Sequence, residues 1–94
     1  MGIIEEGIRM KTWVKDLCPG MNYFNIHVIV VEPRNNTWTT ADGKQVRSFK
    51  VADKTGQVDI SVWGEYCNMI NSGDILLMQN CYSRLYRNRL TINR

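Results

Sequence analysis

The feature that most constrains the fold is the stretch of residues 47–63, RSFKVADKTGQVDISVW. Two segments flank the turn sequence Asp53-Lys54-Thr55-Gly56. An Asp side chain can bond its own backbone two residues on, and Gly can supply a positive φ where a side chain would clash. The stretch therefore predicts two short β-strands joined by a tight turn.

The second strand of this hairpin separates a core face from an outer face. Val58, Ile60 and Val62 share one parity, which we assign to the core. Trp63 has the other parity, together with Asp59 and Ser61. An outward Trp has two interpretations: a strand-end residue covered by a loop, or an exposed ring that binds a partner.

Composition predicts one small folded domain. The chain has 94 residues, of which 44% are hydrophobic, enough for a single modest core. Its net charge of +3 is too mild to indicate nucleic acid by itself. Residues 80–94, however, hold four Arg and no acidic residue. The simplest interpretation of such a run is a solvated basic edge.

The cysteines and the histidine do not form a recognisable site. Cys18, Cys67 and Cys81 are widely spaced without a CxxC pair, and His27 is the single histidine. A structural zinc site needs about four soft ligands in close pairs, so we expect no metal, no cofactor and no disulfide framework. We expect buried thiols and a His27 packed in a strand. No Ser/His/Asp set can be placed, so we expect no enzyme.

Targeting signals are not evident. The first ten residues, MGIIEEGIRM, lack the pattern of a signal peptide, and no segment approaches the ~20 apolar residues of a membrane span. Nucleus or cytosol follows by elimination.

Residues 13–52 predict a long first strand and, after a turn, the strand that leads into the hairpin of residues 47–63. We take residues 1–12 as a tail and residues 13–94 as the domain. Residues 23–32, YFNIHVIVVE, are largely apolar on both faces and predict a central strand covered on much of both sides. Pro33 interrupts its ladder, and Asp42-Gly43 predicts a hairpin turn into residues 44–52. A long, interrupted first strand followed by two hairpin-connected strands suggests a small barrel. Trp38, on the bent strand, either caps this barrel or stands in a binding loop.

The end of the chain completes a five-strand order. Residues 64–70 predict a short helix whose Met69 and Ile70 plug the barrel, and the apolar residues 75–78 predict a buried strand. That strand continues to residue 86, and Arg87-Asn88 turns it into a last strand, because Asn tolerates the left-handed region. Five strands with a short helix between the third and fourth predict an all-β oligonucleotide-binding (OB) barrel.

The last hairpin places several aromatic and basic residues on one outer face. With a two-residue loop, Tyr86 lies opposite Arg89, and Arg84 opposite Thr91, so each pair shares a face. Aromatic rings stack on unpaired bases, and Arg contacts phosphates, so this face suits single-stranded nucleic acid. A packing surface for another protein is the alternative. We expect the binding residues to be Trp38, Arg47, Lys50, Lys54, Trp63, Tyr82, Arg84, Tyr86, Arg87 and Arg89.

Several segments resemble a known family. VKDLCPG, VRSFKVADKTGQVDISVW, SGDILLMQNCYSRLY and RLTI are similar to the single-stranded DNA-binding subunit of the SOSS complex, a short metazoan OB-fold protein. The resemblance covers roughly residues 13–93, and KVADKTG followed by ISVW is its most specific part. It implies single-stranded DNA binding in the nucleus, a role in double-strand break repair, and two partners: an Integrator subunit and a small third protein.

The resemblance also assigns site residues. It implies that Trp63, Tyr82 and Tyr86 are the stacking aromatics, the same residues that parity places on the outer face. A further family aromatic corresponds here to Asn93, and the glycine of the last hairpin to Asn88. The family's Gly-Arg-Gly-Gly run and its partner-binding segment are absent from these 94 residues, which leaves the partner contacts without their expected sequence.

Three hypotheses follow for function. The first is a module that coats single-stranded DNA. The second is an RNA-binding OB domain, which would use the 2′-hydroxyl. The third is a module whose aromatic face docks protein.

Overall fold

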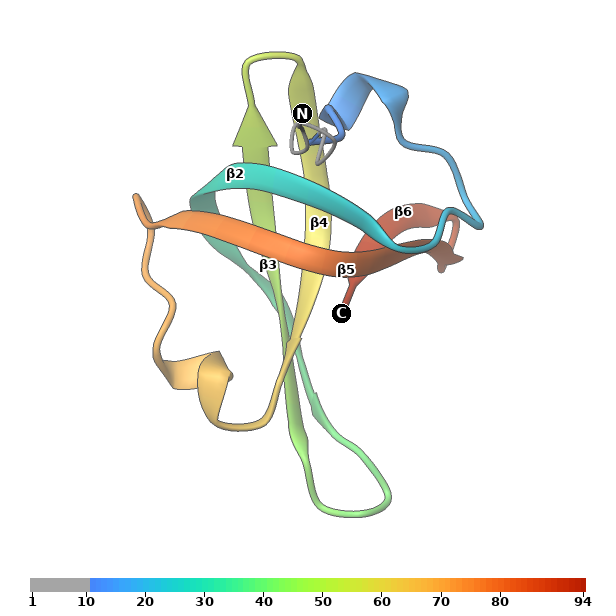
Figure 1. The fold of residues 1–94 in the computed structure, drawn as a ribbon. Coiled ribbons are helices and arrows are strands. Elements are labelled where there is room, and N and C mark those ends of the chain that lie inside the picture. The colour runs from blue at the N-terminus through green and yellow to red at the C-terminus, as the bar shows by residue number, and fades with distance from the viewer. Residues whose placement is uncertain (1–10) are drawn as a thin grey trace, which may run out of the picture.

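Five β-strands close into a barrel in the computed structural model, which describes residues 11–94 (Figure 1). Their order around the barrel is β2-β3-β4-β6-β5. All neighbouring strands are antiparallel except β4 and β6, which are parallel. The strands are β2 (Phe24–Thr39), β3 (Gln45–Asp53), β4 (Gly56–Trp63), β5 (Ile75–Tyr86) and β6 (Arg89–Asn93).

Two short 3-10 helices accompany the strands. The helix η1 (Val14–Asp16) precedes β2, and η2 (Gly64–Asn68) connects β4 to β5. The predicted helix between the third and fourth strands is therefore confirmed. Its role as a plug is only partly right, because Met69 is exposed whereas Cys67 is fully buried and Ile70 packs against the core.

The first strand, β2, is long enough to serve two neighbours. Its first half pairs with β5 and its second half with β3. The ladder with β3 shifts register between Val30 and Glu32 and again between Pro33 and Thr37, so the predicted interruption at Pro33 takes the form of bulges within one strand. Beyond these bulges, the β2–β3 hairpin extends past the barrel as an arm (Figure 1). Gly43, at its tip, has a φ of 89°.

The β3–β4 hairpin follows the predicted turn, with one correction. Asp53 accepts a hydrogen bond from the backbone N–H of Thr55 at 2.7 Å, two residues on, as predicted. Gly56, however, does not have a positive φ. A Cβ at Gly56 would lie 3.3 Å from Val14 Cγ1. The glycine therefore serves the close packing of η1 on the hairpin rather than the turn conformation.

The core confirms the predicted parity of β4. Val58, Ile60 and Val62 are buried inside the barrel. Phe49 and Val51 of β3 lie opposite Ile60 and Val58 and are buried with them. Of the three free thiols, Cys67 and Cys81 are buried as expected and Cys18 is exposed. Burial raises the pKa of the Cys81 thiol to about 11.

The prediction that β2 and the start of β5 are covered on both faces is wrong. Ile29 lies opposite Ile75, and His27 opposite Leu77, on the outside of the barrel. Ile75 is 71% exposed and Leu77 67% exposed, and His27 is exposed rather than packed. An apolar run shows that a strand can be buried in a core. It does not show that an element covers its second face.

The chain before the barrel is described from residue 11. The Thr12 N–H donates to the Asn25 carbonyl at 2.7 Å, which places Thr12 alongside β2. Residues 1–10 of the predicted tail lie outside the described residues. Between residues 11 and 94, no helix is long and apolar enough to cross a bilayer.

Candidate nucleic-acid interface

The register of the β5–β6 hairpin is the predicted one. Tyr86 pairs with Arg89, and Arg84 with Thr91, as the two-residue loop requires. The loop residues Arg87 and Asn88 both have positive φ, 54° and 63°. Two left-handed residues form a type I′ turn, whose twist matches that of the flanking strands.

A bulge at Asn80 sets which side chains of β5 face outward. Asn80 has a φ of 56°, and the ladder with β2 shifts register between Phe24 and Ile26 at this point. Before the bulge, Leu76 and Met78 pack against the core. After it, Cys81 and Ser83 are buried. The change of parity turns Tyr82, Arg84 and Tyr86 outward.

The outer side of the sheet formed by β2, β3 and β4 carries two tryptophans in one row. Trp38 on the arm lies opposite Val46, and Val46 lies opposite Trp63. Directly opposed residues share a face, and strands are spaced about 4.8 Å apart, so the two tryptophans are separated by one strand. Val46, between them, is fully buried although it points away from the barrel interior. Trp63 itself is 41% exposed, so a loop does not cover it.

Trp38 also joins the arm to the β5–β6 hairpin. Its ring stacks on Tyr86, with centroids 5.7 Å apart and planes inclined by 13°. Trp38 therefore stands in the outer face rather than capping the barrel. The guanidinium of Arg87 lies 5.4 Å from the Tyr86 ring centre, and that of Arg84 lies 4.8 Å from the Tyr82 ring centre.

A row of alternating charge crosses the same face. Strand pairing places its members side by side across all five strands, in the order Glu32, Lys50, Asp59, Thr91 and Arg84. A cavity of about 410 Å³ opens beside this row, and Glu32, Asp59 and Thr91 contribute to its lining. We call the surface formed by the two tryptophans, the charged row and the outward residues of the β5–β6 hairpin the outer face.

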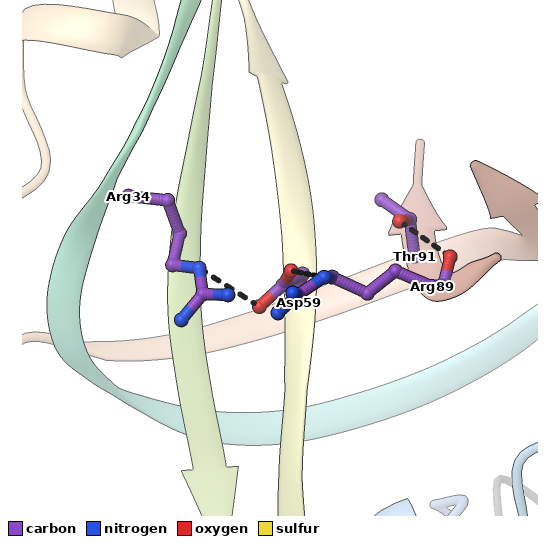
Figure 2. Close-up of polar contacts among 4 residues, drawn as sticks. All are labelled: Arg34, Asp59, Arg89 and Thr91. Atoms are coloured by element: carbon purple, nitrogen blue, oxygen red, sulfur yellow. Dashed lines mark hydrogen bonds and ion pairs between the residues drawn. The ribbon is translucent and has the colours of Figure 1, made fainter. Parts of the chain in front are cut away.

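Asp59 lies at the centre of the charged row and is bracketed by two arginines. Arg34 Nε lies 3.6 Å from one carboxylate oxygen, and Arg89 Nε lies 3.6 Å from the other. Figure 2 shows the two arginines approaching Asp59 from either side. Sequence patterns did not identify Arg34, because it lies in the bulge between Pro33 and Thr37, where strand parity is lost. A basic residue next to Pro33 was the only available signal.

Two predicted residues are not brought to this face. Arg47 lies opposite Val62 on the core-facing side, with its guanidinium 5.0 Å from the centre of the Phe49 ring. Lys54 lies in the β3–β4 turn, at the far end of β4 from Trp63, and its Nζ is 4.9 Å from the centre of the Trp13 ring. The other eight predicted residues gather on the outer face. Their part in binding stays a prediction.

Between residues 11 and 94, no three His, Cys, Asp or Glu side chains are placed to hold a metal ion.

The chain is similar in sequence to an archaeal protein. It is 26% identical, over 86 residues, to the single-stranded DNA binding protein Ssb of Saccharolobus solfataricus. The match covers 89% of this chain and 58% of that protein, so the chain spans little more than half the length of this relative. No protein-family model matches the sequence.

Two solved structures share the fold. The second OB-fold domain of replication protein A from Methanococcus maripaludis superposes with a TM-score of 0.70 at 24% identity, covering 89% of this chain and 88% of that one. The OB domain of a Thermoplasma acidophilum protein gives a TM-score of 0.71 at 15% identity, covering 85% and 74%. With the closed five-stranded barrel, these likenesses show that the chain adopts the OB fold.

Proposed function

We propose that this protein binds single-stranded DNA on the outer face, by base stacking and phosphate contacts, without catalysis. The observation that carries the proposal is the gathering of Trp38, Trp63 and Tyr86 with several arginines on one surface. The similarity to an archaeal single-stranded DNA binding protein supports it.

The geometry suits a strand laid across the outer face. Trp63 offers an open stacking surface, which unpaired bases of any kind can use. A base that stacks on Tyr86 takes the place of Trp38 or Arg87, which contact that ring in the free protein. Arg84 lies beside Tyr82 and can meet the phosphate of a stacked nucleotide. Duplex DNA, whose bases are paired, should compete poorly.

A fluorescence titration with oligo-dT at several salt concentrations tests the proposal. If about three to five phosphates are neutralised, log K falls against log salt with a slope of roughly −2 to −3.5. Arg84→Ala should weaken binding and make the slope shallower. Lys15→Ala, which removes an exposed charge from η1, is the matched control and should change neither. Absence of salt-dependent binding by the wild-type protein would contradict the proposal.

Competition experiments separate the other hypotheses. Oligo-rU that competes better than oligo-dT would favour an RNA-binding domain. If the protein binds no oligonucleotide, the result would favour the hypothesis that its aromatic face docks another protein. Binding should depend little on base sequence, so a strict consensus would contradict stacking as the mechanism.

The finer assignment rests on the sequence resemblance alone. We propose that the protein acts as the single-stranded DNA-binding subunit of a SOSS complex in double-strand break repair in the nucleus, with an Integrator subunit and a small third protein as partners. Gel filtration of the purified chain with these two proteins tests the assembly. Imaging of the tagged protein after induced DNA breaks tests location and repair.

A further inference from the structure

Only one of the two basic residues in the charged row faces acids of the same molecule. Lys50 stands between two acidic residues, opposite Glu32 on β2 and Asp59 on β4. Arg84 is different, because the residue opposite it is Thr91, a hydroxyl. The charges of the outer face are therefore neutralised unevenly in the free protein.

Asp59 is the most buried charge of the cluster. Its side chain is 9% exposed, against 23% for Arg34 and 59% for Arg89. Both ion pairs measure 3.6 Å, longer than the roughly 2.7–2.9 Å of a charge-assisted hydrogen bond. The carboxylate thus attracts both guanidinium groups while leaving their strongest hydrogen bonds available.

We infer that Asp59 is an internal anion that occupies Arg34 and Arg89 until a phosphodiester group of the bound strand enters the adjoining cavity and takes them over. The inference rests on the proposed function and identifies the ligand chemistry of that cavity. Asp59 then weakens the binding of any strand that cannot displace it.

The cavity has the donors that a phosphate requires. Its volume is about 410 Å³, and its lining includes Arg34, Arg87, Arg89 and the hydroxyl residue Ser48. Thr91 also lines the cavity, but its hydroxyl donates to the Arg89 carbonyl at 3.2 Å in the free protein (Figure 2). A guanidinium presents its N–H groups as a fork that matches two phosphate oxygens, a better geometry than an ion pair at 3.6 Å.

Asp59 opposes such a phosphate in two ways. It competes for the arginines, and its own negative charge repels the phosphate. Because the carboxylate is buried, water and salt screen this repulsion less than they would at the surface. Both effects have the same sign, so removal of the charge should strengthen binding.

The alternative is that Asp59 positions the arginines for the strand. The backbone already restricts them: Arg89 is paired with Tyr86 in the β6 ladder, and Arg34 lies in the β2 bulge. Loss of the carboxylate should therefore release the arginines without moving them off the outer face. The two roles predict opposite changes in affinity.

The test compares Asp59→Asn with the wild-type protein in oligo-dT titrations from low to high salt. Asp59→Asn should bind roughly three- to tenfold more tightly at low salt, and its log K should fall more steeply against log salt, because salt screens the repulsion that Asp59 exerts on the phosphate in the wild-type protein. Asp16→Asn, which removes an exposed acid from η1, is the matched control for net charge and should leave both quantities unchanged.

A second comparison uses the arginines. In the wild-type background, Arg84→Gln should weaken binding more than Arg89→Gln, because the attraction between Arg89 and the phosphate is partly offset by the loss of the Arg89–Asp59 ion pair. In the Asp59→Asn background, the two losses should become similar. This change in the difference is not expected if Asp59 has a structural role alone.

Each remaining outcome overturns the inference. Equal or weaker binding by a folded Asp59→Asn protein would assign the carboxylate to positioning. If neither Asp59→Asn nor Asp59→Ser shows a cooperative melt, the carboxylate is required for the fold and is not a displaceable anion. A wild-type protein that does not bind oligo-dT overturns both the inference and the proposed function, whereas the other results overturn the inference alone.

Discussion

The two halves of β5 present chemically different side chains to solvent. Before Asn80, the outward residues are Ile75 and Leu77, which pair with Ile29 and His27 of β2. After Asn80, they are the aromatic and basic residues Tyr82, Arg84 and Tyr86, all three paired with β6. The segment of β5 before the bulge thus contributes an apolar outer surface, and the segment after it contributes part of the candidate binding surface. The bulge, by shifting parity, keeps the second set of side chains out of the core.

The largest expected effect comes from removing the bulge. Deletion of Asn80 should reverse the parity of residues 81–86, sending Tyr82 and Arg84 toward the core and Cys81 outward. We expect loss of the cooperative melt and of oligo-dT binding. Asn80→Gly is the control, because glycine adopts a φ of 56° without strain, and it should fold and bind. A deletion variant that folds and binds normally would contradict the role given to the bulge.

The next effect separates the outer face from the core within β4. Trp63→Ala should cost about 1–3 kcal/mol of binding, roughly fivefold to over a hundredfold in affinity, with little change in stability. Val62→Ala removes buried methyl groups and should lower the melting temperature while leaving the affinity of the folded protein nearly intact. Melting curves and oligo-dT titrations measure both. The reverse pattern would show that the face of β4 has been misassigned.

Asp53, in the β3–β4 turn and outside β5, tests whether a change in stability away from the outer face leaves oligo-dT binding unchanged. Burial tends to raise the pKa of Asp53, but hydrogen bonds from Thr55, Val14 and Gly56 outweigh it and hold the pKa below the ordinary value of 3.8. A lowered pKa in the folded state means that this stabilisation is complete above the unfolded pKa and is lost as pH falls through the folded one.

The corresponding variant is Asp53→Asn. It should lose about 1 kcal/mol of stability at pH 7, because the amide cannot accept all of these bonds. The difference in melting temperature from the wild type should shrink as the pH falls below about 4. Oligo-dT affinity at pH 7 should not change, since Asp53 lies at the far end of β4 from Trp63. A difference that stays constant with pH would contradict the assignment.

The smallest effect is expected on the apolar half of β5. Leu77→Lys places a charge on a side chain that is 67% exposed, so stability should change by no more than about 0.5 kcal/mol. Affinity should stay within about twofold of the wild type, because the new charge is outside the outer face. A strong gain in affinity would show that the strand also follows this half of β5.

Residue patterns alone determined the local structure of this protein. The parity of β4 and the register of the β5–β6 hairpin follow from the period of two in a strand and from residues that tolerate a left-handed turn. The Asp53 turn follows from a side chain that bonds its own backbone. The strand parity, the hairpin register and the turn each depend on residues close in sequence. Steric contacts and hydrogen bonds between these nearby residues restrict their backbone conformations.

Only the tertiary structure decided what is covered and what meets across the barrel. The apolar run that includes Ile75 and Leu77 did not show whether a second layer lies over it. Barrel closure and the β2 bulges bring Arg34 to Asp59, and the arm carries Trp38 onto Tyr86. These contacts join strands distant in sequence, so their geometry depends on the closure and bulges of the whole sheet, which local patterns do not encode.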